Sequence, residues 1–188
     1  DIGCFDVIKQ QFDGLDFSFE ETNYKNISNL IITNGDSKNK TFCFLGHTDV
    51  VPPGPESEWS VPPFSGEIID NKIYGRGAAD MKGGVACFIS ALKEFLSENK
   101  DPSFNIIVLL NSNEEGKLEN GKVDRVINEM IEKDKFIDFC LIGEPSSSKK
   151  VGDVIRIGRR GSLSGNLKVY GIQAVSYTHL RAHETIQH

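Results

Sequence analysis

Ionisable side chains stand at the places in this 188-residue sequence where apolar runs end or an amphipathic segment begins. They are His47, Asp49, Asp80, Glu114, Glu115 and Glu144. Five carboxylates gathered in a small space could not all stay ionised without a cation among them. Because imidazole and carboxylate groups together suit Zn²⁺ or a similar divalent ion, these residue types predict a metal site, and the number of carboxylates favours two ions over one.

The spacing of these residues favours catalysis over a purely structural metal site. In the pattern His-x-Asp, side chains alternate along an extended chain, so Asp49 can hold the imidazole of His47 in its metal-binding tautomer. Of the consecutive Glu114 and Glu115, one can bind a metal while the other takes a proton from water. No C-x-x-C pair accompanies them, which argues against a closed structural zinc site. Each residue alone also has an ordinary structural explanation, such as a helix N-cap for Asp80.

The elements that must position these residues can be read from the apolar periodicity. Residues 29–47 contain two apolar runs around a polar turn, which predicts two strands, and residues 67–77 are strand-like around an Asp-Asn turn. Helical spacing predicts an amphipathic helix within residues 80–99, capped by Asp80, and a second helix at 123–133. Continuous apolar runs within 104–116 and 136–145 predict strands that are buried on both faces.

The order of these elements predicts an α/β fold. Strands that alternate with helices form βαβ units, in which a largely parallel sheet carries helices on its faces. Ligands of such sheets bind beyond the carboxyl ends of the strands. The ionisable residues would then meet at one edge of the sheet, and the chain length favours one domain.

Composition excludes several classes of protein. The net charge of -6 gives no basic surface for nucleic acid, and the apolar runs are shorter than the roughly 20 residues that span a bilayer. The first residues have no starting methionine, basic segment or apolar segment, so no secretory signal is expected. The cysteines (Cys4, Cys43, Cys87 and Cys140) are widely spaced, and three of them lie in apolar runs. They predict small buried thiols of a protein in the reducing cytoplasm.

Six motifs in order give the chain a resemblance to a known family. They are GHTDVVPPG, WSVPPF, IYGRGAADMKGG, NSNEEG, GEPSSSKKVGD and GRRGSLSGNL, spread over residues 3 to 173. Together they resemble the zinc-dependent deacylases and exopeptidases, which include succinyl-diaminopimelate desuccinylases, acetylornithine deacetylases and aminoacylases. Within that family the motifs are most similar to the desuccinylases. The resemblance implies a three-layer αβα catalytic domain around a mostly parallel mixed sheet, with the lid and dimerisation domain absent.

The resemblance also implies roles for individual residues. His47, Asp80 and Glu144 would hold one zinc, and Asp80 would bridge to a second zinc held by Glu115. Glu114 would be the general base, Asp49 would orient His47, and Arg159, more than Arg160, would pair with a substrate carboxylate. Cobalt is the alternative metal. The reaction implied is hydrolysis of the amide of N-succinyl-L,L-diaminopimelate, a small-molecule substrate, by an enzyme that is a homodimer when intact.

The resemblance stops after Gln173. Residues 1–173 would form part of a catalytic domain, and residues 174–188 would be a foreign or disordered tail, so His179, His183 and His188 receive no role. One histidine that the family uses for its second zinc would be missing, which predicts a fragment without useful activity. Two other functions stay open: an acetylornithine deacetylase or related metallopeptidase, and a non-catalytic domain that binds a ligand or partner.

Overall fold

The structure is a computed structural model that describes residues 3–35, 39–116, 123–158 and 165–168. Along the chain, the strands are β1 (Ser18–Tyr24), β2 (Ile27–Asn34), β3 (Thr41–His47), β4 (Glu67–Ile69), β5 (Lys72–Tyr74), β6 (Asn105–Asn111) and β7 (Phe139–Ile142). The helices are α1 (Cys4–Gln10), α2 (Gly83–Glu98) and α3 (Val123–Glu132), with short helical turns at Glu56–Glu58 and Ala78–Lys82.

Five strands form the main sheet in the order β1-β2-β6-β3-β7. The strands β3 and β7 run parallel to β6, whereas β2 runs antiparallel to both β1 and β6. Strand β1 therefore points the same way as β6, β3 and β7, and only β2 is reversed. The mostly parallel mixed sheet predicted from the sequence is confirmed.

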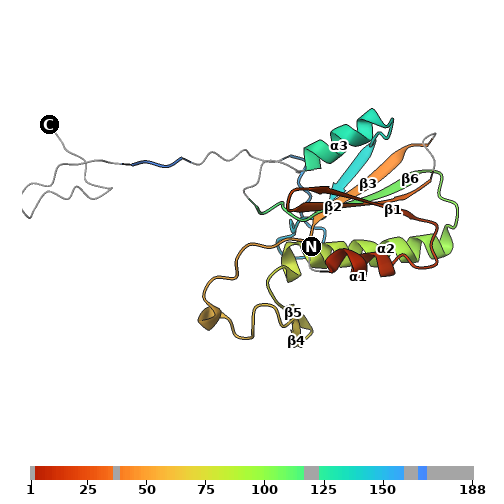
Figure 1. The fold of residues 1–188 in the computed structure, drawn as a ribbon. Coiled ribbons are helices and arrows are strands. Elements are labelled where there is room, and N and C mark those ends of the chain that lie inside the picture. The colour runs from red at the N-terminus through yellow and green to blue at the C-terminus, as the bar shows by residue number, and fades with distance from the viewer. Residues whose placement is uncertain (1–2, 36–38, 117–122, 159–164, 169–188) are drawn as a thin grey trace, which may run out of the picture.

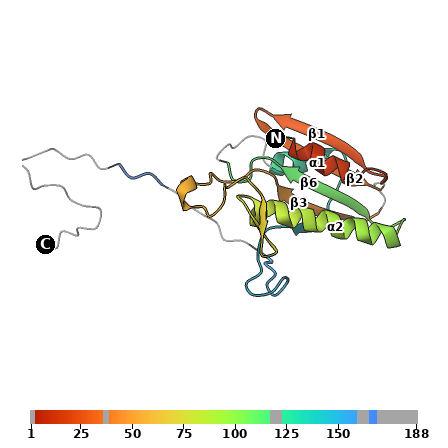
Figure 2. The same cartoon turned by 90° about the horizontal axis from the view of Figure 1, so that it is seen from below.

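Helices cover both faces of this sheet, giving three layers (Figure 1). Helix α3 lies on one face, and α1 and α2 lie together on the other, where Figure 2 shows them side by side. Successive residues of β6 serve the two cores in turn: Ile106 and Val108 pack toward α1 and α2, and Ile107 and Leu109 toward α3. This two-sided burial explains the unbroken apolar run in the sequence.

The strand β7 departs from the prediction that it would be buried on both faces. It lies at the margin of the sheet and pairs only with β3 among the described residues, so Phe139 is 58% exposed and Ile142 is 50% exposed. The prediction that the cysteines are buried was wrong in part. Cys43 on the neighbouring strand is buried, whereas Cys140 on β7 and Cys87 on α2 are exposed.

Strands β4 and β5 form a separate hairpin that stands away from the main sheet (Figure 1). Asp70 and Asn71 occupy its two-residue turn with φ values of 50° and 58°. Positive φ at both central residues is the geometry that such hairpins require, and Asp and Asn tolerate it. The Asp-Asn turn predicted from the sequence is confirmed.

Two further details were not foreseen. The segments β2 and β3 are both strands, as expected, but they are not neighbours, because β6 inserts between them. Helix α1 and strand β1 were not predicted. Helix α1 is only seven residues long, and β1 alternates exposed and half-buried positions, so neither produces a strong apolar pattern. Within the described residues, none of the helices has the length and apolar character needed to traverse a lipid bilayer.

Candidate metal centre

The predicted site residues follow the carboxyl ends of three adjacent parallel strands. His47 is the last residue of β3, Glu114 and Glu115 follow β6, and Glu144 follows β7. Because β6, β3 and β7 are neighbours that point the same way, these ends meet at one edge of the sheet. The topology alone therefore brings residues nearly 100 positions apart in the chain to one place.

His47 is the centre of the group. Its side chain is 1% exposed, and its Nε2 atom lies 3.1 Å from Asp80 Oδ1 and 3.6 Å from Glu144 Oε1. His47, Asp80 and Glu144 each offer a ligand atom within 4.8 Å of the others, and so do His47, Glu114 and Glu115. One imidazole thus belongs to two sets of potential ligands, each completed by two carboxylates.

Asp49 connects the imidazole to the glutamate turn. Its carboxylate lies 3.5 Å from His47 Nδ1, and its backbone carbonyl lies 3.0 Å from the same nitrogen. Its two carboxylate oxygens also accept hydrogen bonds from the backbone N–H groups of Glu114 and Glu115, both at 2.9 Å. The sequence predicted the contact with His47, but nothing in the sequence signalled the second contact.

The turn that carries Glu114 and Glu115 is fixed by Asn111, a residue that sequence reasoning did not single out. The Asn111 side chain is buried, donates to Asn29 Oδ1 on β2 at 2.5 Å, and accepts the backbone N–H of Asn113 at 2.7 Å. The Asn111 carbonyl accepts the N–H of Thr48 at 2.8 Å. The sequence did contain a signal for this role of Asn111. An asparagine at the end of an otherwise apolar strand indicates a buried amide, and a buried polar group needs hydrogen-bond partners.

Asp80 reaches the site from a different kind of element than expected. The prediction that it caps a helix was wrong: α2 begins at Gly83, and Asp80 lies before it with extended backbone (φ -122°, ψ 103°). The next residue, Met81, is fully buried, and its Sδ atom accepts the backbone N–H of His47 at 3.3 Å. This buried side chain anchors the segment, so the Asp80 carboxylate is directed at His47 instead of at helix amides.

Close backbone contact brings α2 against the end of β7. A Cβ atom on Gly84 would lie 2.4 Å from the carbonyl oxygen of Gly143, and a Cβ on Gly143 would lie 2.5 Å from Phe44 Cζ. No side chain fits at either position without displacement of the neighbouring group. The glycines therefore set the separation between the segments that carry Asp80 and Glu144.

The electrostatics of the cluster show an excess of negative charge around one imidazole. Burial lowers the pKa of His47, but the hydrogen bonds and charge of Asp49, with the charge of Glu144, outweigh burial and raise that pKa to about 9. Burial raises the pKa of Asp49, yet its hydrogen bonds from His47, Glu114 and Glu115 bring it below its ordinary value. Burial and the neighbouring charges of Glu114 and Asp80 raise the pKa of Glu115.

This arrangement fits a divalent cation. The ligand atoms are one imidazole nitrogen and several carboxylate oxygens, which is the donor chemistry of zinc and related ions, and the carboxylates otherwise crowd together. Asp49 on the far side of the ring supplies the outer partner that metal-binding histidines normally have. The predicted substrate residues Arg159 and Arg160, and the tail histidines, lie outside the described residues.

Comparison with known proteins identifies the family. Residues 43–186 match the sequence profile of peptidase family M20/M25/M40. The chain is 45% identical over 181 residues to a succinyl-diaminopimelate desuccinylase of Alkalilimnicola ehrlichii, and 46% identical over 173 residues to that of Methylococcus capsulatus. These alignments cover 96% and 92% of this chain, but the chain spans only about half the length of the curated relatives, 48% and 45%.

Solved structures agree on the fold. The M20 family metallo-carboxypeptidase Sso-CP2 of Sulfolobus solfataricus has a TM-score of 0.61 and 26% identity, over 74% of this chain and 31% of that one. Human carnosine dipeptidase 1 also has a TM-score of 0.61, with 24% identity over 73% of this chain and 31% of its own, and supports the fold alone. With its fold, its cluster of candidate metal ligands and a profile match over most of its length, the chain belongs to peptidase family M20/M25/M40.

Proposed function

We propose that the protein to which this chain contributes is a di-zinc hydrolase that cleaves N-succinyl-L,L-diaminopimelate to succinate and L,L-diaminopimelate. The observation that carries the proposal is the meeting of His47, Asp80 and Glu144 beside Glu114 and Glu115 at one sheet edge. The identity of about 45% to several curated desuccinylases, over nearly the whole chain, supports the choice of substrate.

Two overlapping sets of residues would hold the metals. His47, Asp80 and Glu144 would bind one ion, for which the distances of 3.1 Å and 3.6 Å from His47 Nε2 to the two carboxylates leave suitable space. Asp80 would bridge to a second ion that Glu115 also binds. Zinc is the metal that the donor set favours, and cobalt is the alternative. When bound, such ions supply Lewis acidity that activates water and polarises the amide carbonyl.

The chain's own residues would handle the proton and the orientation. The Glu114 carboxylate would accept a proton from the attacking water and return it to the leaving amine nitrogen. Its position is supported by the bond from its backbone N–H to Asp49 Oδ1. Asp49 would hold His47 by its Nδ1 side, so that Nε2 faces the ligand carboxylates.

Recognition of the substrate would fall to arginine. Arg159 would pair with a carboxylate of the substrate, with Arg160 as its neighbour, because a guanidinium binds a carboxylate through two parallel hydrogen bonds. The enzyme would work in the cytoplasm as a homodimer on a small dissolved substrate. Nucleic acid is not a partner in this proposal, given the net charge of -6.

The test requires the completed enzyme, which is this sequence within a protein of the length of its curated relatives, of which the chain spans about half. We expect this enzyme, loaded with zinc, to hydrolyse succinyl-diaminopimelate with a higher kcat/KM than acetylornithine or dipeptides. Preference for acetylornithine would indicate a deacetylase instead, and preference for a peptide would indicate a peptidase. Zinc binding without any hydrolysis across the panel would favour a non-catalytic domain.

A further inference from the structure

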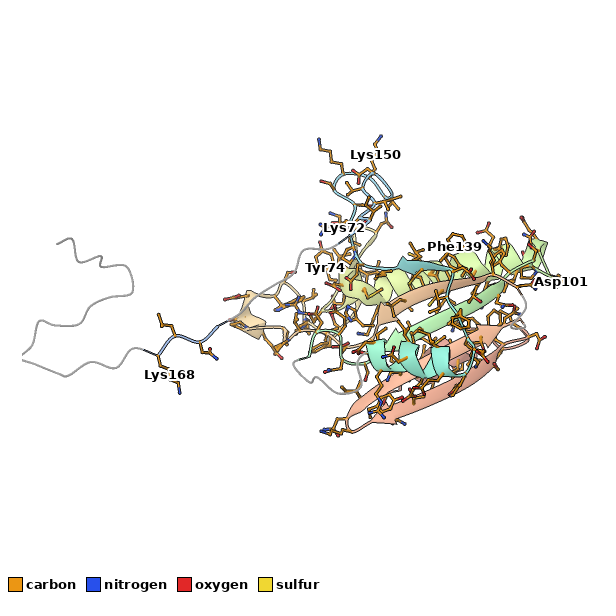
Figure 3. All side chains as sticks on the ribbon, turned by 90° about the horizontal axis from the view of Figure 1, so that it is seen from above. Lys72, Tyr74, Asp101, Phe139, Lys150 and Lys168 are labelled. Carbon is orange, nitrogen blue, oxygen red and sulfur yellow. The ribbon has the colours of Figure 1, made fainter. Side chains whose placement is uncertain are left out.

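An arginine joins the proline-rich loop that follows β3 to the segment that carries Asp80. Arg76 lies four residues before Asp80, shortly after β5, whose last residue Tyr74 is labelled in Figure 3. Its Nη2 atom donates a hydrogen bond to the Pro53 carbonyl at 3.4 Å. Its guanidinium carbon lies 5.1 Å from the centre of the Trp59 ring, within the range of a cation–π contact.

This arginine contacts the loop near both of the loop's ends. Trp59 Nε1 donates to the same Pro53 carbonyl at 3.0 Å, so Arg76 and Trp59 share one acceptor near the start of the loop. The backbone N–H of Arg76 donates to the Pro63 carbonyl near the end of the loop at 2.7 Å. Residues 52–63 contain five prolines, which have no N–H group to donate. The loop therefore depends on donors from outside it, and Arg76 supplies two of them.

The contact between loop and segment continues toward the metal centre at the next residue. A Cβ atom on Gly77 would lie 2.6 Å from Val50 Cγ1, and Gly77 has a φ of 87°, so a side chain does not fit there without displacement. Val50 directly follows Asp49 in the chain. The loop and the segment are thus packed closely between Asp49 on one side and Asp80 on the other.

Stabilisation of the loop alone does not account for an arginine at this position. Among the described residues, the Nε–H group of Arg76 is buried and has no hydrogen-bond partner. A buried donor without an acceptor lowers stability, and an apolar side chain of similar length would avoid that cost. What a guanidinium adds is a flat face for Trp59 together with a directed N–H group for Pro53, and both fix its position.

We propose that Arg76 is a positioning residue, which keeps the Asp80 carboxylate beside His47 by fixing residues 75–80 to the proline-rich loop. In the proposed function, on which this inference rests, Asp80 is a metal ligand. Buried Met81 anchors the segment from the core side, through the backbone N–H of His47. Arg76 anchors it from the loop side. With the second anchor lost, Asp80 Oδ1 is free to move from its place 3.1 Å from His47 Nε2.

The first test measures the zinc affinity of the 188-residue chain by competition with a chelator. Arg76→Met keeps the length of the side chain but removes its charge and its N–H groups. It should lower the affinity about tenfold, the lower end of the usual effect of losing support around metal ligands. Arg76→Lys keeps the charge without the planar fork and should recover only part of the affinity.

Arg125→Met is the matched control. Arg125 also lies over an aromatic ring, 3.9 Å from the centre of Tyr24, and it also forms a polar contact, an ion pair with Glu129 at 3.2 Å. It belongs to α3 and does not contact the proline-rich loop in the described part of the chain. Its loss should leave the zinc affinity unchanged.

A double-mutant cycle shows whether Arg76 acts through Asp80. In a chain that carries Asp80→Ala, the further change Arg76→Met should alter the remaining zinc affinity by less than about twofold. In a chain that carries Glu144→Ala, the loss of about tenfold should persist. An undiminished loss in the Asp80→Ala chain would mean that Arg76 acts on another part of the site.

A measurement without metal keeps the role of Arg76 testable even if the chain binds no zinc, a result that would contradict the proposed function alone. The backbone N–H groups of Arg76, Ala78 and Lys82 form hydrogen bonds at 2.7–3.1 Å. In the Arg76→Met chain, hydrogen exchange should become faster at these positions and stay unchanged in β6. Unchanged exchange in residues 75–82, or equally faster exchange in β6, overturns the positioning role, and so does zinc affinity of Arg76→Met within about twofold of the parent.

Discussion

The carboxylate of Asp49 accepts the backbone N–H of Glu114 at 2.9 Å, across a gap of 65 positions in the chain. The other oxygen of the same carboxylate accepts the N–H of Glu115. Asp49 therefore does more than orient His47: it links the end of β3 to the turn after β6 and sets where both glutamates stand. The position of the imidazole and the position of the glutamate turn are therefore coupled through the side chain of Asp49.

Replacing Asp49 by Asn should weaken metal binding by about 10–100-fold, the usual effect of losing an outer partner of a metal-binding histidine. The Asn side chain keeps the shape of Asp, but one of its two carboxylate oxygens is replaced by an NH₂ group. This group cannot accept a hydrogen bond from the backbone N–H that faces it. Competition with a chelator measures the affinity. Asp101→Asn is a matched control, because Asp101 (labelled in Figure 3) is exposed and precedes β6, at the end of that strand away from the site. Equal affinity of both variants would show that Asp49 does not support the site.

In the completed enzyme, Glu114→Gln should retain zinc but lose turnover by about 10²–10⁴-fold, because an amide cannot accept the proton from water. Metal content by elemental analysis and kcat for succinyl-diaminopimelate separate the two effects. Glu98→Gln, an exposed change at the end of α2, should leave both unchanged. Activity of Glu114→Gln within about tenfold of the parent would mean that another group is the base.

The sequence allowed the main sheet and the convergence of the ionisable residues to be predicted, because both follow from local patterns. Apolar runs mark β3 and β6, and the rule that parallel strands end at one edge gathers His47, Glu114 and Glu144. The order of strands was not accessible in this way. That β6 inserts between β2 and β3 is decided by packing between distant segments, which leaves no local pattern.

The parts that escaped prediction depend on backbone geometry or on position in the sheet. Asp80 is at a position typical of a helix N-cap, but buried Met81 holds that segment in a different conformation and directs the carboxylate to His47. Cys140 lies in an apolar run like that of Cys43, and only the marginal place of β7 makes it exposed. The substrate-binding role of Arg159 and the end of the domain at residue 173 both stay predictions. The profile match extends to residue 186.

Gly84→Ala should lower the free energy of unfolding by about 1–3 kcal/mol, the usual cost of overpacking. The added Cβ would meet the Gly143 carbonyl oxygen at 2.4 Å, so α2 must move away from the end of β7. Because Asp80 and Glu144 lie on either side of that contact, zinc affinity should fall as well. Urea denaturation and chelator competition measure the two effects. Gly158→Ala, where the new Cβ meets nothing within 4 Å, should change neither.

The loop after Glu144 should respond to acid through Asp153. Hydrogen bonds from the backbone N–H groups of Ser148, Lys149 and Lys150 lower the pKa of the Asp153 carboxyl below its ordinary value. A depressed pKa in the folded state means that this stabilisation is complete above the unfolded pKa of about 3.9 and is lost as the pH falls through the folded value. Nuclear magnetic resonance shifts of the three amides should titrate with a midpoint below that of an unfolded Asp. Asp153→Asn should abolish this titration, and its persistence would assign it to another group.

The 188-residue chain itself should bind one zinc ion detectably and hydrolyse succinyl-diaminopimelate poorly or not at all. His47, Asp80 and Glu144 provide three ligands for the first ion, a set suited to an open catalytic site. Asp80 and Glu115 alone would hold a second ion weakly, since two carboxylates without an imidazole are a poor zinc site. Calorimetry should therefore show one strong binding event per chain.

Excess zinc should not restore hydrolysis to this chain, whereas completing the chain should. The second ion has only Asp80 and Glu115 as ligands in this chain, which spans about half the length of its curated relatives. Turnover is measured for the chain and the completed enzyme side by side, at rising zinc concentrations. The variant Glu114→Gln of the completed enzyme sets the background. Turnover by the 188-residue chain comparable to that of the completed enzyme would mean that one strongly held ion suffices, and the two-metal account would be wrong.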